Sequence, residues 1–172
     1  MQFSGKRVVV TGACGVHGAW IVEAFAREGA TLCLSDRRIK DVEALIDRLK
    51  LPRATTLTHA TELTDEASIV ECAKLVQKHW GAADVVINNA GIYPRGLLLD
   101  LPAADWDAVM DINVRAVFLM TREFAKLMIA FLLGVAPLAI GATIFEKTKG
   151  IFEAWLSAMI GYLMYPVASA GI

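Results

Sequence analysis

The chain has 172 residues, a formal net charge of −1, and 20% charged residues. This length suits one domain, and the balanced charge without a Lys/Arg cluster excludes the electrostatic footprint of a nucleic-acid-binding protein. A hydrophobic content of 56% excludes intrinsic disorder. Cys14, Cys33 and Cys72 lack the spacing of a metal site, and their odd number argues against a disulfide framework. We therefore expect reduced structural thiols in a cytoplasmic domain, with no metal bound and no signal peptide in residues 1–7.

The composition changes after residue 126. Residues 1–126 contain 15 of the 17 Lys and Arg residues and 16 of the 18 Asp and Glu residues. The remaining residues, 127–172, hold only four charged side chains and contribute much of the high mean hydropathy of +0.50. We therefore predict two parts, a domain over residues 1–126 and an apolar tail over residues 127–172.

Eight elements are predicted in residues 1–126, because short apolar runs alternate with stretches that are apolar at helical spacing. In chain order, they are a strand over 7–10, a helix with apolar residues at 21–26, a strand over 31–34, a helix with apolar residues at 42–49, a strand over 54–58, a helix over 69–80, a strand over 84–87 and a helix over about 105–126. The last helix is predicted to have one apolar face, made by Trp106, Val109, Met110, Asn113 and Val117.

Strands that alternate with helices of this length predict βαβ units, a parallel sheet and right-handed crossovers. The predicted fold class is therefore α/β, with a partial doubly wound, Rossmann-like parallel sheet of about four strands in the order 3-2-1-4. This sheet is about two thirds of a complete doubly wound sheet.

Two uncharged apolar runs of 19 residues each make up most of the tail, over residues 127–145 and 154–172. Each run approaches the roughly 20 residues that cross a bilayer, and each contains Pro and Gly, which membrane helices tolerate better than soluble helices do. The tail is predicted as an apolar α-helical hairpin that spans a membrane. A helix pair packed on the sheet is the alternative.

A glycine-rich loop lies between the first predicted strand and the first predicted helix. It contains Gly12, Gly15 and Gly18, with Val16 and His17 between the last two. Glycine lets the backbone approach a pyrophosphate, and the helix N-terminus offers free N–H groups and the positive end of the helix dipole. The loop is predicted to bind the pyrophosphate of a dinucleotide, and a tight turn that binds nothing is the alternative.

Asp36 ends the second predicted strand, 18 residues after Gly18. An acid at this place accepts hydrogen bonds from the ribose hydroxyls of an adenosine and repels a 2′-phosphate. NAD is therefore expected in preference to NADP, and the neighbouring Arg37 and Arg38 would weaken that preference. A surface Asp that caps a turn is the alternative.

Four motifs in order resemble the short-chain dehydrogenase/reductase family over about residues 3–126. They are Thr11-Gly12 with its glycines, Leu63-Thr64-Asp65, Asn88-Asn89-Ala90-Gly91 and Met110-Asp111-Ile112-Asn113-Val114. The resemblance implies an NAD(P)-dependent oxidoreductase that moves hydride between nicotinamide and an alcohol or ketone. The cofactor-binding residues that it implies are Gly12, Gly15, Val16, His17, Gly18, Asp36, Glu62, Leu63, Asn89, Ala90 and Gly91.

The resemblance also implies a role for each group of these residues. Glu62 stands where the family usually has an Asp that contacts adenine, and residues 89–91 would shape the floor beneath the cofactor. Asn113 resembles the catalytic Asn, which kinks its helix and orders a water in the proton relay. A buried structural Asn is the alternative for Asn113.

The chain departs from the family pattern in its catalytic residues. The family needs a Tyr with a Lys four residues later, and a Ser about a dozen residues before the Tyr. The residues four after the three tyrosines are Leu97, Pro166 and Ser169. The commoner family pattern also has Gly where Val16 stands. We therefore expect an oxidoreductase that is incomplete and inactive as it stands, without the fifth to seventh strands and the substrate pocket.

Residues 130–172 resemble the multi-spanning inner-membrane subunit of bacterial type IV secretion and conjugation systems, on Ala136-Pro137-Leu138 and on the segments 145–148 and 152–156. The alternative function is therefore a non-catalytic chimeric fragment with a membrane-inserting tail. The expected partners are a dinucleotide, a small alcohol or ketone only if the missing segments are supplied, and a membrane through the tail. Residues 1–126 are expected in the cytoplasm and the tail in the bacterial inner membrane.

Overall fold

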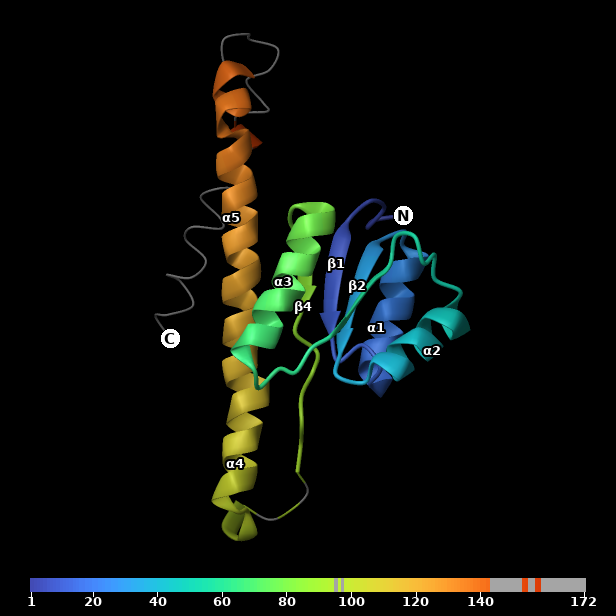
Figure 1. Cartoon of the computed structure of the whole chain (residues 1–172), viewed down its shortest axis with the longest axis vertical. Helices are drawn as coiled ribbons and strands as arrows, with labels where there is room; N and C mark the ends of the chain where they lie inside the picture. Colours follow the sequence, from blue (N-terminus) through green and yellow to red (C-terminus); the bar gives the residue numbers. More distant parts are fainter. Residues whose placement is uncertain (95, 97, 143–152, 155–156, 159–172) are drawn as a thin grey trace. The chain divides into compact units, whose positions relative to one another are not determined.

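The computed structural model describes residues 1–94, 96, 98–142, 153–154 and 157–158 (Figure 1). Contacts divide the chain into two units, Met1–Phe124 and Ala125–Ile172. The first unit contains the sheet and all the residues that line the candidate site.

Four parallel strands form the sheet: β1 (Arg7–Thr11), β2 (Thr31–Asp36), β3 (Leu57–Ala60) and β4 (Val85–Ile87). Their order is β3-β2-β1-β4, which confirms the predicted order. Val9 of β1 pairs with Cys33 of β2 on one side and with Val86 of β4 on the other. The three consecutive valines of β1 are completely buried, as expected of a strand that is covered on both faces.

Three helices connect the strands: α1 (Val16–Arg27), α2 (Ile39–Leu49) and α3 (Glu66–Trp80). Figure 1 shows α1 and α2 on one side of the sheet and α3 on the other. Val8 and Val10 pack in one cluster with Val22 of α1 and Val42 of α2. Because successive strand residues point to opposite faces, Val9 faces the other side, where α3 buries Ile69, Cys72, Ala73 and Val76.

The third strand begins later than predicted. Residues 54–58 are the predicted strand, whereas β3 is Leu57–Ala60. The carbonyl of Pro52 accepts the N–H groups of Thr55 and Thr56, each at 3.1 Å, and thereby closes a turn in the predicted strand. Pairing with β2 begins only at Leu57, opposite Cys33. The shift places Thr61 and Glu62 at the carboxyl edge of the sheet.

The range predicted as one helix, about 105–126, is helical throughout, but a π-helical turn interrupts it and the helix continues beyond residue 126. A 3₁₀ turn (Leu98–Asp100) precedes α4 (Ala103–Met110), which leads into a π-helical turn (Asp111–Arg115) and α5 (Ala116–Ala142). The Ala116 N–H bonds to the Asp111 carbonyl across this turn.

The apolar face predicted for the last helix is wrong, since Trp106 and Met110 are 52% and 38% exposed. An extra residue in a turn rotates the following face by about 100°, and α5 instead buries Ala116, Leu119, Met120 and Phe124.

The structure does not show the helical hairpin predicted after residue 126. Residues 146–152, between the two apolar runs, and most of the second run, at 154–172, lie outside the described residues. Among the helices that the structure describes, none combines the length and the apolarity needed to cross a membrane.

The starts of β1 and β4 are joined by an ion pair. Asp84 Oδ2 accepts the backbone N–H and the Nε–H of Arg7, both at 2.8 Å, and Oδ1 accepts a second guanidinium N–H at 3.1 Å. These hydrogen bonds lower the pKa of the Asp84 carboxyl below its ordinary value of 3.8. Because β4 is only three residues long, this pair is an important part of its attachment to the sheet.

We expect Asp84→Asn to lower the free energy of unfolding by about 1–2 kcal/mol at neutral pH, the low end for a charged hydrogen bond because the pair is partly exposed. A depressed carboxyl pKa stabilises the fold fully above its unfolded value of 3.8 and loses this effect as the pH falls through the lower folded value. Urea unfolding of both proteins should therefore give a difference that shrinks in acid. A difference that is independent of pH would contradict the electrostatic origin.

Candidate functional site

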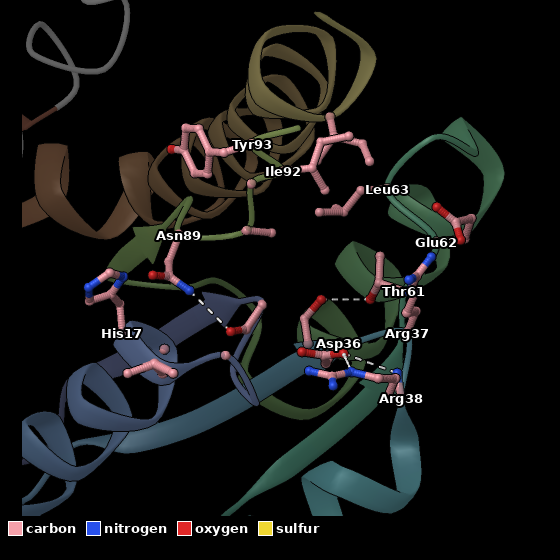
Figure 2. A pocket seen from close by; sticks show the side chains of 18 residues that line it. His17, Asp36, Arg37, Arg38, Thr61, Glu62, Leu63, Asn89, Ile92 and Tyr93 are labelled. Carbon is pink, nitrogen blue, oxygen red and sulfur yellow. Dashed lines mark hydrogen bonds and ion pairs between the residues drawn. The ribbon is translucent and has the colours of Figure 1, made fainter. Parts of the chain in front are cut away.

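A cavity of about 680 Å³ lies at the carboxyl ends of the strands (Figure 2). In open parallel sheets, ligands bind at this edge, at the point where the strand order reverses. The order here reverses at β1, which has β2 on one side and β4 on the other. The lining residues follow the four strands or belong to the π-helical turn: Gly12, Gly15, Val16, His17, Gly18, Ser35, Asp36, Arg37, Arg38, Thr61, Glu62, Leu63, Asn89, Ala90, Gly91, Ile92, Tyr93 and Ile112.

All eleven cofactor-binding residues predicted from the sequence line this one cavity. Asn113 does not line it, although the adjacent Ile112 does. Sequence analysis gave no site role to Ser35, Thr61, Ile92, Tyr93 and Ile112, and it mentioned Arg37 and Arg38 only as modifiers. Most of these residues are within two positions of a predicted residue at a strand end. Extending the predicted site to the neighbours of each strand end would have found them.

Glycine is required at two positions after β1, because neighbouring atoms leave no room for a Cβ there. Gly12 has a φ of +61°, and a Cβ there would lie 2.8 Å from the Cα of Ala90. A Cβ on Gly18 would lie 2.1 Å from the carbonyl oxygen of Gly12 and 2.9 Å from Nδ2 of Asn89. The loop after β1 therefore sits directly against the loop after β4, with no room for side chains between them.

The N-terminus of α1 begins inside this loop. Gly15 is the N-cap residue and forms no side-chain cap hydrogen bond. The first N–H groups of a helix have no partner within the helix, and Gly15, Val16, His17 and Gly18 all line the cavity. The arrangement therefore offers backbone donors and the positive end of a helix dipole to an anionic group in the cavity.

Asn89 and Thr11 join the two loops. The Asn89 side chain donates from Nδ2 to the carbonyls of Thr11 and Gly12, at 2.9 and 3.1 Å. The Thr11 hydroxyl oxygen accepts the N–H groups of Asn89 and Ala90, each at 3.1 Å. Two of these four bonds use the Asn89 side-chain amide nitrogen and the other two are donated by backbone N–H groups, so together they fix the floor of the cavity.

Asp36 stands in the wall of the cavity with its side chain 8% exposed. Its Oδ2 accepts the N–H of Cys14 at 3.2 Å, and its Oδ1 accepts the N–H of Arg38 at 3.1 Å. Burial and the nearby Asp36 carboxylate raise the pKa of the Cys14 thiol to about 11. Cys14 is therefore protonated near neutral pH and is not a nucleophile at this site.

The two arginines after Asp36 differ in their surroundings. Arg38 pairs with Asp36 at 3.4 Å and with Asp41 at 3.1 Å, so its charge is shared between two carboxylates. Arg37 lines the cavity and has no ion-pair partner in the part of the chain that the structure describes. Figure 2 places Arg37, Arg38 and Glu62 at one end of the cavity, and His17, Asn89 and Tyr93 at the other.

Asn113 lies in the π-helical turn and binds the loop after β4. Its Oδ1 accepts the N–H of Ile92, and its Nδ2 donates to the carbonyl of Ile92, both at 2.9 Å. The irregular helix geometry at this residue agrees with the kink that the family resemblance implies. The paired bonds show that the side chain holds Ile92, which itself lines the cavity.

A family model described as short chain dehydrogenase matches residues 6–134. The 3-oxoacyl-[acyl-carrier-protein] reductase of Thermotoga maritima is 32% identical over 129 residues, which cover 75% of this chain and 52% of the relative. The chain belongs to the short-chain dehydrogenase/reductase family. It spans about half the length of the curated relatives that it matches.

Solved structures of the family have the same fold. An NAD⁺-bound xylitol dehydrogenase has a TM-score of 0.71 and 26% identity, over 77% of this chain and 51% of that chain. A metagenomic short-chain oxidoreductase in complex with NADP has a TM-score of 0.69 and 32% identity, over 77% and 60%. Since one neighbour holds NAD⁺ and the other NADP, the family membership supports a nicotinamide dinucleotide without choosing between the two.

A second family model, described as TrbL/VirB6 plasmid conjugal transfer protein, matches residues 114–172. The two matches overlap over residues 114–134. The match covers the tail segment that resembles a conjugation-system subunit in the sequence, and most of the matched segment beyond residue 142 lies outside the described residues.

Proposed function

We propose that the cavity is an NAD site and that the chain carries the dinucleotide-binding part of a short-chain dehydrogenase. The observation that carries this proposal is the convergence of eleven residues, chosen from the sequence for dinucleotide contacts, on one cavity. The glycine-rich packing and the exposed helix N-terminus fit a pyrophosphate, because a phosphate needs close backbone N–H donors. A nicotinamide dinucleotide, when bound, supplies a hydride donor or acceptor.

The proposed orientation follows from the chemistry of the two ends of the cavity. The pyrophosphate would lie on Gly12, Gly15 and Gly18, with the adenosine ribose at Asp36. Adenine would lie beside Glu62 and Leu63, and the nicotinamide end would lie over residues 89–91. Val16 carries a Cβ that the commoner family pattern lacks at the pyrophosphate, so weak binding is expected.

The proton chemistry is incomplete in the 172-residue sequence. Tyr93 lines the cavity, but the residue four positions after it is Leu97 and not the Lys of the Tyr-x-x-x-Lys pattern. The resemblance assigns Asn113 to the proton relay, and its two bonds to Ile92 support a positioning role for its side chain. We therefore propose dinucleotide binding for this chain, with reduction or oxidation of an alcohol or ketone only when the missing Ser, Tyr and Lys are supplied.

The Asp36→Ala variant tests the proposed site. It should weaken NAD binding by about 10-fold, because it removes charged hydrogen bonds to the ribose, and it should shift the preference towards NADP, because the repulsion of the 2′-phosphate is lost and Arg37 remains. The measurement is calorimetric titration with both dinucleotides.

The matched control is Asp41→Ala, because Asp41 shares Arg38 with Asp36 but does not line the cavity. The control should bind NAD as the unchanged chain does. Equal NAD affinity in the Asp36→Ala variant and the unchanged chain would remove Asp36 from the site.

The conjugal-transfer match favours a second candidate, a non-catalytic chimeric chain with a membrane-inserting tail. The two candidates differ in their dependence on detergent. A monomeric protein that needs no detergent and binds NAD supports the first candidate. Recovery only from membranes, without NAD binding, supports the second.

A further inference from the structure

The turn after β3 holds the carboxylate of Glu62 in a fixed place. Glu62 Oε1 accepts the N–H of Thr64 at 3.2 Å and the hydroxyl of Thr64 at 2.9 Å. The backbone N–H of Glu62 donates to Oγ of Ser68 at 3.0 Å. Glu62 Oε2 has no hydrogen-bond partner in the part of the chain that the structure describes, and Glu62 lines the cavity. One carboxylate oxygen is therefore anchored and the other is available to a ligand.

Arg115 belongs to the π-helical turn and binds Thr64 in the turn after β3, 51 positions earlier in the chain. Its guanidinium donates from Nη1 to the carbonyl of Thr64 at 3.3 Å, and its Nη2 lies 3.8 Å from Oε2 of Glu66. Thr64 is thus held through its carbonyl by Arg115, while its N–H and hydroxyl hold Glu62. Because Asn113 of the same turn binds Ile92, the π-helical turn contacts both walls of the cavity.

Glu62 Oε2 is a hydrogen-bond acceptor, and no donor in the part of the chain that the structure describes bonds to it. Adenine presents an amino group, which is a donor, whereas hypoxanthine has a carbonyl oxygen at the same ring position. Hypoxanthine carries its donor on the neighbouring N1 instead, so a carboxylate oxygen anchored against the 6-position favours adenine and repels hypoxanthine, and this discrimination depends on the placement of the carboxylate. A binding site whose polar group bonds to a group of the ligand rejects an analogue that lacks this ligand group.

We propose that Arg115 is a positioning residue that acts through Thr64 to orient the Glu62 carboxylate, and that it thereby helps to select adenine over hypoxanthine. The inference rests on the proposed NAD function, because it places adenine beside Glu62. It extends that function by assigning base selection to a residue that does not line the cavity.

The test is calorimetric titration of the full chain with NAD and with nicotinamide hypoxanthine dinucleotide. The unchanged chain should prefer NAD by about 10-fold, the value of one charged hydrogen bond. Arg115→Ala should reduce this ratio to about threefold or less, and Arg115→Lys should restore part of it, because Lys can still donate to the Thr64 carbonyl. A purely structural loss would weaken both dinucleotides equally and leave the ratio unchanged.

The matched control is Arg122→Ala. Arg122 binds the same Glu66 side chain, at 2.5 Å from Oε1, and among the described residues it forms no hydrogen bond with Thr64. This variant should keep the ratio of the unchanged chain. A double-mutant cycle adds a second check, since Arg115→Ala should have no further effect on the ratio in a Glu62→Ala background.

The outcomes separate the two proposals. Absence of NAD binding by the unchanged chain would overturn the proposed function. If the unchanged chain binds NAD but Arg115→Ala leaves the ratio of the two dinucleotide affinities unchanged, the role of Arg115 alone is overturned. The same conclusion follows if Arg122→Ala lowers this ratio as much as Arg115→Ala does. Equal affinity of the unchanged chain for the two dinucleotides would show that Glu62 does not select adenine, and it would overturn the inference.

Discussion

Replacing Gly18 with alanine is expected to destabilise the fold and to abolish measurable dinucleotide binding. The new Cβ would lie 2.1 Å from the carbonyl oxygen of Gly12, a contact with backbone that cannot rotate away. Gly12 cannot easily yield, because its carbonyl already accepts the Asn89 side-chain amide at 3.1 Å and the Gly15 N–H at 3.1 Å. Such overpacking typically costs about 1–3 kcal/mol, and the displaced loop should lose NAD affinity by more than about 10-fold, since its N–H groups would no longer converge on the phosphates.

Two other glycines provide graded controls for Gly18→Ala. A Cβ on Gly15 would approach the Gly12 carbonyl only to 3.3 Å, and a Cβ on Gly96 would meet nothing within 4 Å. Gly15→Ala should therefore weaken binding less, and Gly96→Ala should leave both thermal unfolding and NAD titration unchanged. If Gly18→Ala bound NAD as tightly as the unchanged chain, the loop would not form the pyrophosphate site.

The parallel sheet could be predicted because each strand leaves a local signal. Three consecutive valines in β1 indicate a strand buried on both faces, and β1 is completely buried at these positions. The cavity could be predicted for a related reason. Carboxyl ends of neighbouring parallel strands meet at one edge, so residues that follow different strands converge even when they are far apart in sequence, as Gly18, Asp36 and Asn89 do.

The errors come from interactions that are not local in the sequence or not periodic. The start of β3 was misplaced because the carbonyl of Pro52 accepts two N–H groups that a strand pattern assigns to the sheet. The π-helical turn was missed because helical periodicity assumes a constant phase, whereas Asn113 binds the backbone of Ile92, 21 positions away. That single turn also explains why the wrong face of the last helix was predicted to be buried.

The partners of individual side chains were likewise beyond a sequence pattern. Asp36 was selected for its place at the end of β2, but its bond to the Cys14 N–H depends on how the loop after β1 folds back. Arg115 left no signal, since it neither lines the cavity nor belongs to a glycine or acidic motif. Residues that act through another residue are recognised only when the contacts are known.

The purified 172-residue chain is expected to show no oxidation or reduction of simple alcohols and ketones with NAD(H) above background. Hydride transfer to a carbonyl leaves an alkoxide that must receive a proton, and a positioned acid or base typically contributes about 10²–10⁴-fold. Of the described residues, Tyr93 is the one phenol at the cavity, and no Lys follows it at the four-residue spacing by which the family lowers the Tyr pKa. Asn113 uses both ends of its amide on Ile92.

Binding and turnover should therefore separate in this chain. The glycine loop, Asp36 and Glu62 all lie before residue 91, so the proposed adenosine and pyrophosphate contacts do not involve the residues of the proton relay. The assay follows nicotinamide absorbance over a panel of alcohols and ketones that includes xylitol, with the NAD⁺-bound xylitol dehydrogenase as the active reference. Turnover by the purified chain that Asn113→Ala abolishes would refute the expectation. Such turnover would also show that the π-helical turn, without the Tyr and Lys of the family pattern, supports proton transfer, and Tyr93 would then be the first residue to replace.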